Sequence, residues 1–215
     1  MEMNAFREVY PFSSNFFEVD GHKIHYLDEG KGEPILMLHG NPTWSFFYRN
    51  FIPSLSQTNR TVAVDHLGCG LSDKPSNYKY LLENHIQNLE KLVAKLGLEK
   101  ITLIMHDWGG AIGTGYAVRH PENIKRIVVL NTAAFLAPKG YTFPWRIRIC
   151  RIPLVGPIGV RCLNLFVKWA MPMAIMHKER LTTQVRAGYT APYNSYANRI
   201  AVLEFVRDIP LSKGE

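Results

Sequence analysis

The stretch LIMHDWGGAIG, residues 103–113, decides the fold. Its first residues are apolar and predict the end of a strand, whereas the small residues after Trp108 predict the start of a helix. A strand, a sharp turn and a helix with small residues form a nucleophile elbow, in which the turn lifts one side chain out of the sheet. Here that side chain is the carboxylate of Asp107, which the amides and dipole of a helix N-terminus keep ionised and oriented. The alternative is that Asp107 only caps the helix.

Four apolar runs, each ending in polar or glycine residues, make up the surroundings of the elbow: PILMLHG (34–40), TVAVDHLG (61–68), ITLIMHD (101–107) and RIVVLNTA (126–133). Such runs predict strands that are buried on both faces of a parallel sheet. Residues 80–98 predict a helix, because their apolar residues recur at helical spacing, and residues 16–20 and 23–29 predict a hairpin. This order of strands and helices predicts a mostly parallel, doubly wound α/β sheet.

The strand rhythm ends after Ala134. Residues 137–207 are rich in Pro, Arg, Met and aromatic residues and predict several short helices. A helical insertion at the carboxyl end of a strand covers the crevice in which open α/β sheets bind ligands. We therefore interpret it as a cap, with a plain second domain as the alternative. The predicted units are an incomplete core (1–136), the cap (137–207) and the start of a return to the core (208–215).

Composition excludes several function classes. The 215 residues carry a formal charge of +7 and are 47% hydrophobic, but no Lys/Arg run or motif predicts a nucleic-acid partner. Cys69, Cys150 and Cys162 are too few and too scattered for a disulfide framework or a zinc site, so we expect reduced thiols, no metal, no cofactor and a cytoplasmic location. The first residues lack the pattern of a signal peptide, and charges and prolines interrupt residues 154–175, the most apolar later stretch.

A second segment, LMLHGNPTWSFFYRN (36–50), follows the strand from which such folds draw half of an oxyanion hole. The residue after the nucleophile supplies the other half, so Asn41 and Trp108 occupy the two places. Both carry side-chain N–H donors, which we expect to converge on an anion beside Asp107, while their backbone amides face a carboxyl oxygen. Taken separately, they are as well explained as a turn residue and a packing aromatic.

The segments HGNPTWSFFYRN (39–50), AVDHLGCGLSDKP (63–75) and HDWGGAIG (106–113) together resemble the haloalkane dehalogenase family of α/β-hydrolases. The resemblance implies an α/β-hydrolase fold with a helical cap, here lacking the last core strands. It implies Asp107 as the nucleophile and Asn41 with Trp108 as the halide-binding pair. Epoxide hydrolases share the HDWGG element but typically carry an aromatic residue at the position of Asn41. Residues 146–157, 185–202 and 205–211 resemble the branch that includes β-lactone decarboxylases of long-chain olefin synthesis.

A carboxylate at the elbow suits displacement at a saturated carbon. A serine would form an ether, which water cleaves poorly, whereas Asp107 would form an ester that water can hydrolyse. The resemblance thus implies carbon–halogen cleavage on a small hydrophobic alkyl halide, with water as the second substrate. The alternatives are β-lactone decarboxylation to an alkene, epoxide hydrolysis, and an inactive fragment without base and acid.

The sequence departs from the family where the base and acid are expected. Only His120 and His177 follow Asp107, and neither matches the position of the family's base. Asn131 and Thr132 stand where some dehalogenases place the acid. We therefore expect a fragment or a truncated product, with a short variant completed by another polypeptide as the alternative. The chain alone should perform at most one turnover and retain an alkyl group on Asp107. An unpaired apolar sixth strand predicts that the isolated chain is poorly soluble or molten.

Four other groups have plainer interpretations. The loop containing Asp65 is interpreted as structural, and His39 and His106 are expected to hydrogen-bond loop backbone. Tyrosines of the cap are interpreted as packing residues: Tyr189, Tyr193 and Tyr196. Three arginines alternate with isoleucines and predict a solvated basic face, with an acidic protein partner, a carboxylate substrate or a membrane surface as the alternatives: Arg146, Arg148 and Arg151.

Overall fold

The computed structural model describes residues 3–133 and 141–210. The strands of the described residues are β1 (Asn15–Val19), β2 (His22–Glu29), β3 (Glu33–Leu38), β4 (Asn59–Val64), β5 (Ile101–His106) and β6 (Ile124–Leu130). They form one sheet in the order β1-β2-β4-β3-β5-β6. The neighbours among β3, β4, β5 and β6 are parallel, whereas β1 and β2 continue the sheet as an antiparallel hairpin. The predicted hairpin and mostly parallel sheet are confirmed.

The helices are α1 (Ile52–Leu55), α2 (Leu82–Leu96), α3 (Trp108–Arg119), α4 (Trp145–Arg151), α5 (Leu165–Ala174), α6 (Thr183–Thr190) and α7 (Ile200–Arg207). Short 3-10 turns cover Met3–Val9, Ser45–Tyr48, Pro121–Asn123, Lys178–Arg180, Ala191–Tyr193 and Ala197–Arg199, and Pro157–Cys162 forms a π-helical turn. None of the described helices combines the length and apolar character needed to cross a bilayer.

The sheet buries both of its faces, as the continuous apolar runs predict. In β3, Leu36 and Leu38 point to the core under α2 and α3, whereas Ile35 and Met37 point to a second core on the other face. Successive side chains of a strand alternate between faces, so a strand needs apolar residues at every position to fill two cores. The core under α2 and α3 also includes α7, and the second core includes α6.

The site lies where the direction of strand addition reverses. From β3 the chain adds β4 on one side, then passes back across β3 to add β5 on its other side. Leu38 and Met105 are register partners at the ends of β3 and β5. The segments that follow these strands therefore separate at the carboxyl edge of the sheet, which is the position at which open α/β sheets bind ligands. They carry Asn41 and Asp107.

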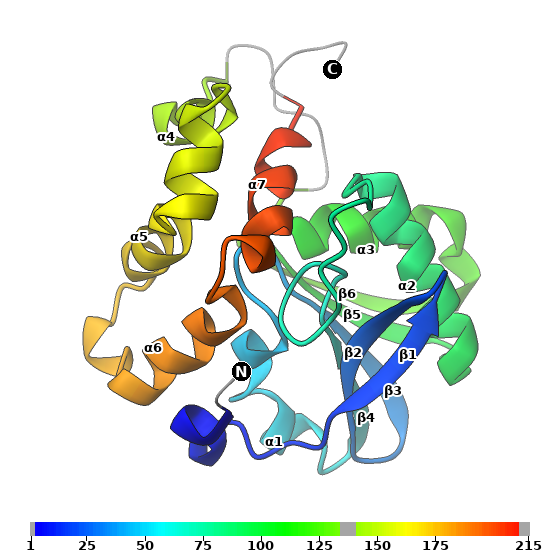
Figure 1. The fold of residues 1–215 in the computed structure, drawn as a ribbon. Coiled ribbons are helices and arrows are strands. Elements are labelled where there is room, and N and C mark those ends of the chain that lie inside the picture. The colour runs from blue at the N-terminus through cyan, green and yellow to red at the C-terminus, as the bar shows by residue number, and fades with distance from the viewer. Residues whose placement is uncertain (1–2, 134–140, 211–215) are drawn as a thin grey trace.

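The helices after residue 141, for which we keep the name cap from the sequence interpretation, contact the core through α6 and α7. Figure 1 shows α4 and α5, in yellow, on the side of α7 that faces away from the sheet. The cap has a small core of its own that includes Val160, Val167 and Tyr193 together with residues of α7. The boundary predicted at 136/137 lies outside the described residues, as do residues 211–215 of the predicted return, so these divisions remain predictions.

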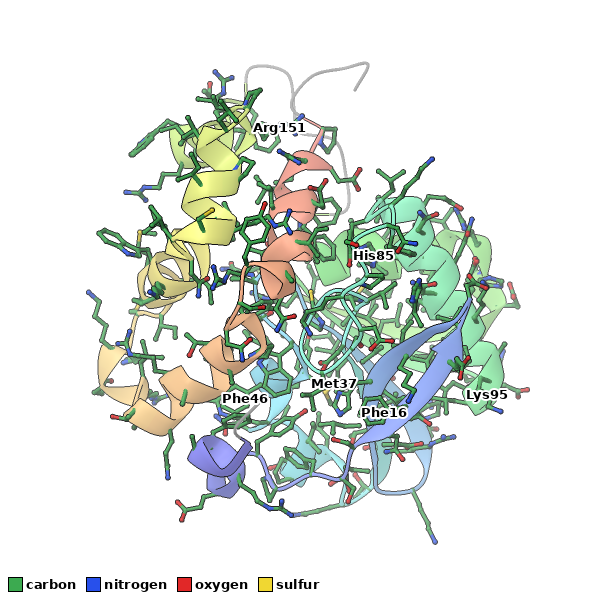
Figure 2. All side chains as sticks on the ribbon, viewed as in Figure 1. Phe16, Met37, Phe46, His85, Lys95 and Arg151 are labelled. Carbon is green, nitrogen blue, oxygen red and sulfur yellow. The ribbon has the colours of Figure 1, made fainter. Side chains whose placement is uncertain are left out.

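The prediction of a solvated basic face on the cap is wrong for Arg151. Arg146 and Arg148 are exposed, but Arg151 is half-buried and donates hydrogen bonds to the carbonyl oxygens of Val206 and Ile209. Figure 2 shows Arg151 between α4 and α7. The helical turn directs this guanidinium toward the carboxyl end of α7, where free carbonyl groups and the negative end of the helix dipole attract a cation.

Strand β6 forms the edge of the described sheet and exposes apolar side chains on both faces. Ile127 and Val129 are 47% and 58% exposed, and Val128, which points the other way, is 40% exposed. Exposed apolar edge strands favour association of sheets. We expect Val129→Lys to lower aggregation of the chain several-fold, measured by light scattering at matched concentration. Gln57→Lys, at an exposed position outside the sheet, is the control and should change aggregation little. Equal aggregation of the Val129 variant and the parent would contradict the expectation.

Candidate active site

Asp107 occupies the turn between β5 and α3 in a strained backbone conformation. Its φ and ψ are 49° and −124°, which a residue with a Cβ adopts at a cost of roughly 1–3 kcal/mol. The neighbouring chain must come close for this turn to form. A Cβ on Gly109 would lie 2.1 Å from the carbonyl oxygen of Leu38, and one on Gly40 would lie 2.1 Å from Oδ1 of Asp107. The glycines thus allow the elbow to pack against the loop after β3.

The carboxylate of Asp107 accepts a backbone hydrogen bond from that loop. The amide N–H of Asn41 donates to Oδ1 of Asp107 at 2.7 Å. The hydroxyl of Thr132, just after β6, donates to the carbonyl oxygen of Asp107 at 2.5 Å. The expected contact between a backbone amide and the carboxyl group is therefore present for Asn41. Two neighbouring strand ends hold the side chain and the backbone of the elbow.

The side chain of Asn41 contacts the cap. Its Nδ2 donates to the carbonyl oxygen of Val202 in α7 at 3.0 Å. An amide nitrogen has two hydrogens, so one donor remains for a ligand beside Asp107. Its Oδ1 is buried and accepts no hydrogen bond within the described residues. The predicted donor is thus in place, but it also joins the core to the cap.

Two further hydrogen bonds join the same loop to the cap. The indole N–H of Trp44 donates to the carbonyl oxygen of Gly188 at 3.0 Å, and the hydroxyl of Tyr193 donates to the carbonyl oxygen of Thr43 at 3.2 Å. Trp44 and Tyr193 are fully buried. The segment 41–44 therefore connects Asp107, through the Asn41 amide, to three positions of the cap.

Trp108 belongs to a column of aromatic rings. Its indole packs against Phe205 of α7 with centroids 5.2 Å apart, and Phe205 stacks on His85 of α2 at 4.6 Å and 15°. Figure 2 shows His85 beside α7. Burial, and to a smaller extent the charge of His39, lower the pKa of His85 to about 3, so this ring is neutral at pH 7 and packs as an apolar residue. The column fixes the plane of the Trp108 ring.

The histidines that adjoin the elbow are held in structural roles. His39 donates through Nδ1 to the carbonyl oxygen of Gly40 at 2.8 Å and accepts the amide of His66 on Nε2 at 3.0 Å, so the expected bonds to loop backbone are confirmed for His39. The same expectation is wrong for His106. Its ring stacks on Phe47 at 4.2 Å, and its buried Nδ1 has no partner within the described residues. Burial lowers the pKa of both rings, although Asp107 partly opposes this for His106.

The two downstream histidines lie outside this site. His120 ends α3, stacks on Tyr116 and hydrogen-bonds to Glu90 at 3.1 Å. His177 is exposed in the cap and pairs with Glu179 at 3.0 Å. The structure brings Asn41, Trp108 and Asp107 together and brings neither of these histidines to them. Across residues 3–133 and 141–210, no group of three or more His, Cys, Asp or Glu side chains is arranged to hold a metal ion.

The sequence did not predict three residues that lie far from Asp107 or Asn41 in the chain but contact the site. Thr132, Val202 and Phe205 each contact one of the three predicted residues. The resemblance to dehalogenases implies only an acid at the position of Thr132, but a hydroxyl after β6 is a usable signal because the carboxyl ends of neighbouring parallel strands lie close together. Val202 acts through its backbone, which no side-chain pattern reports.

The mostly parallel sheet, the elbow between β5 and α3 and the position of Asp107 at the carboxyl edge are typical of an α/β-hydrolase. Residues 33–148 match the family model described as alpha/beta hydrolase fold, and the chain belongs to this family. It is 49% identical over 210 residues to a cis-3-alkyl-4-alkyloxetan-2-one decarboxylase of Shewanella oneidensis, covering 96% of this chain and 66% of the relative. It is 37% identical over 206 residues to haloalkane dehalogenase 2 of Mycobacterium tuberculosis, covering 94% of this chain and 69% of the relative.

Solved structures agree with this assignment. The haloalkane dehalogenase DatA of Agrobacterium tumefaciens superimposes with a TM-score of 0.82 at 29% identity, over 92% of this chain and 68% of that one. The chain thus spans about two thirds of the length of these relatives. The predicted α/β-hydrolase fold and the resemblance to haloalkane dehalogenases and β-lactone decarboxylases are confirmed.

Proposed function

We propose that Asp107 is the nucleophile of a haloalkane dehalogenase-type reaction. The carboxylate attacks the carbon that bears the halogen, a carbon–oxygen bond forms, and the halide leaves with the electron pair of the broken carbon–halogen bond. The product is an alkyl ester of Asp107. The observation that carries this proposal is the hydrogen bond from the Asn41 amide to Oδ1 of Asp107, which leaves Oδ2 as the attacking oxygen.

The leaving halide would meet the two side-chain donors beside the carboxylate. The indole N–H of Trp108 has no acceptor among the described residues, and Asn41 has one amide hydrogen left after its bond to Val202. Preorganised donors of this kind stabilise charge that develops in the transition state. Hydrolysis of the ester at its carbonyl carbon needs a general base to take the proton of water, and no such base adjoins Asp107 among the described residues, so we expect the ester to persist on this chain.

A second candidate is decarboxylation of a β-lactone, favoured by the 49% identity to the Shewanella enzyme. Asp107 would attack the saturated ring carbon that bears the ring oxygen, and the bond between this carbon and the ring oxygen would break to release a carboxylate. Loss of carbon dioxide would then supply the electron pair of the new double bond as the bond to Asp107 breaks. The carboxylate returns without consuming water.

One set of assays separates the two reactions. The chain is incubated with a brominated alkane and, separately, with a cis-dialkyl β-lactone, and bromide, alkene and carbon dioxide are measured. Bromide release dependent on Asp107 supports the first proposal. Alkene release without bromide supports the second. Neither product together with no adduct on Asp107 would overturn both.

Asn41→Ala tests the leaving-group donor. We expect the rate of bromide release in the first turnover to fall by about 100-fold, because removal of one preorganised donor typically costs this much. The backbone amide of residue 41 remains, so the carboxylate keeps its hydrogen bond. Asn164→Ala is the matched control, because it removes a buried asparagine that bonds to Tyr193 within the cap. A control that loses as much activity as Asn41→Ala would show that cap integrity, and not the donor, sets the rate.

We place the protein in a reducing compartment such as the cytoplasm, supported by three cysteines that form no disulfide. The exposed Arg146 and Arg148 support docking of an acidic protein or membrane surface to α4.

A further inference from the structure

Three side chains on the hairpin side of the sheet are joined in line by hydrogen bonds, and the proposed reaction does not use them. Oγ of Ser14 lies 3.0 Å from Nε2 of His25, and Nδ1 of His25 lies 2.8 Å from Oδ2 of Asp65. Ser14 directly precedes β1, His25 lies within β2, and Asp65 directly follows β4. Antiparallel pairing of β2 with both neighbours brings these three positions together.

The hydrogen bonds around Asp65 indicate the direction of the protons in this line. Oδ1 accepts the backbone N–H of Ser45 at 2.7 Å, and Oδ2 accepts that of Leu71 at 2.8 Å. Two backbone donors, one on each oxygen, favour the ionised carboxylate. An ionised Asp65 accepts from Nδ1 of His25, and in this tautomer Nε2 is the acceptor for the hydroxyl of Ser14. This is the tautomer in which a histidine accepts the proton of a serine nucleophile.

Solvent reaches one end of the line. His25 and Asp65 are fully buried, whereas Ser14 is exposed. Ser14 lines an open hollow of about 400 Å³ with Tyr10, Phe12 and Arg7. The base is thus shielded from water while the hydroxyl faces a space large enough for a small acyl group.

The hollow also indicates what such a group would look like. Phe12 and Arg7 both line the hollow, so it offers an apolar surface and a cation. Phe16, exposed at the start of the hairpin in Figure 2, contacts the ring of His25 edge-on at 5.3 Å. Apolar surface beside a single cation suits a short apolar acyl chain, with or without a carboxylate at its far end.

We propose that Ser14 is a second nucleophile, activated by His25 and Asp65, that accepts acyl or phosphonyl groups from small activated esters. Oγ of Ser14 bonds to the carbonyl carbon while its proton passes to Nε2 of His25. The bond to the leaving alcohol then breaks, and the alcohol takes that proton. Water hydrolyses the acyl-serine by the same route and releases the acid. This activity goes beyond the proposed function and does not involve Asp107.

A fluorophosphonate probe tests the proposal on the full 215-residue chain. Oγ of Ser14 would bond to phosphorus as the phosphorus–fluorine bond breaks, with fluoride leaving and the proton passing through His25. We expect one adduct, mapped to Ser14 by peptide mass spectrometry and absent when the chain is unfolded in urea. His25→Asn should slow labelling by about 100-fold or more, as expected for loss of a general base.

Matched variants separate an activated serine from a merely exposed one. Ser14→Ala should remove the adduct. Ser13→Ala, at a neighbouring residue that lines the same hollow, should label at the parental rate, as should Asp107→Asn. The proposal is overturned by an adduct that maps away from Ser14, by no adduct, or by equal labelling in urea. If His25→Asn does not fold, the Ser13 and Ser14 variants and the urea comparison still decide.

Discussion

Asp107→Asn is expected to abolish alkylation of the chain. When the parent is incubated with a 1-bromoalkane, its mass should rise by that of one alkyl group, carried on residue 107. The asparagine keeps the size of the side chain and an oxygen that can accept the bond from the Asn41 amide, but it is not a nucleophile toward saturated carbon. Loss of the nucleophile should slow adduct formation by about a thousandfold or more. Intact-protein mass spectrometry with peptide mapping measures both quantities.

The control for this prediction is Asp28→Asn, which changes a carboxylate on β2 that is paired with Arg60 away from the elbow. It should be alkylated at the parental rate. Alkylation of Asp107→Asn at the parental rate, or an adduct on another carboxylate of the parent, would contradict the assignment of Asp107. Labelling of Ser14 by a fluorophosphonate has its own readout, so neither result decides the other.

The sheet and the elbow could be predicted because their signals are local. Continuous apolar runs, whose alternate residues fill the two faces of the sheet, identify β3, β4 and β5. The small residues after Trp108 permit the close approach that the elbow requires. Parallel strands place their carboxyl ends at one edge, so Asn41 and Asp107 could be placed together without coordinates.

The docking of the cap could not be predicted, because its bonds join residues far apart in sequence through backbone atoms. The side-chain amide of Asn41 donates to the carbonyl oxygen of Val202 in α7, 161 residues later. Any residue at position 202 offers that carbonyl, so the sequence carries no trace of the bond. The same holds for Trp44 and Gly188, which join the loop after β3 to α6.

The partners of the histidines near the elbow could not be predicted from the sequence. A strand-end histidine has two nitrogens, and the sequence does not say which face of the strand it occupies. His39 reaches loop backbone, whereas His106 lies against Phe47. His39 and His106 follow the register partners Leu38 and Met105 and so hold equivalent positions on neighbouring strands. Only the packing of the loops decides which ring is hydrogen-bonded and which is stacked.

Asp65→Ala is expected to cause a large loss of stability. The carboxylate is fully buried and accepts three hydrogen bonds, from the amides of Ser45 and Leu71 and from Nδ1 of His25. Removing it leaves three buried donors without this acceptor, each of which costs about 1–3 kcal/mol. Because relaxation relieves part of this cost, we expect the free energy of unfolding to fall by about 3–5 kcal/mol. Urea denaturation followed by circular dichroism measures it.

The same carboxylate should make stability depend on pH. Burial alone raises the pKa of Asp65, but His25, His39 and the amide of Leu71 outweigh burial and hold it below its usual value. A folded-state pKa below that of the unfolded chain adds stability at neutral pH, which is lost as the pH falls from about 5 toward the folded-state pKa. The Asp65→Ala variant should therefore lose less stability between neutral and acid pH than the parent does.

The control for both measurements is Asp28→Ala, which removes a partly exposed ion pair with Arg60 and should lower the free energy of unfolding by about 1 kcal/mol or less. Equal losses for the two variants would show that the buried hydrogen bonds of Asp65 do not stabilise the fold.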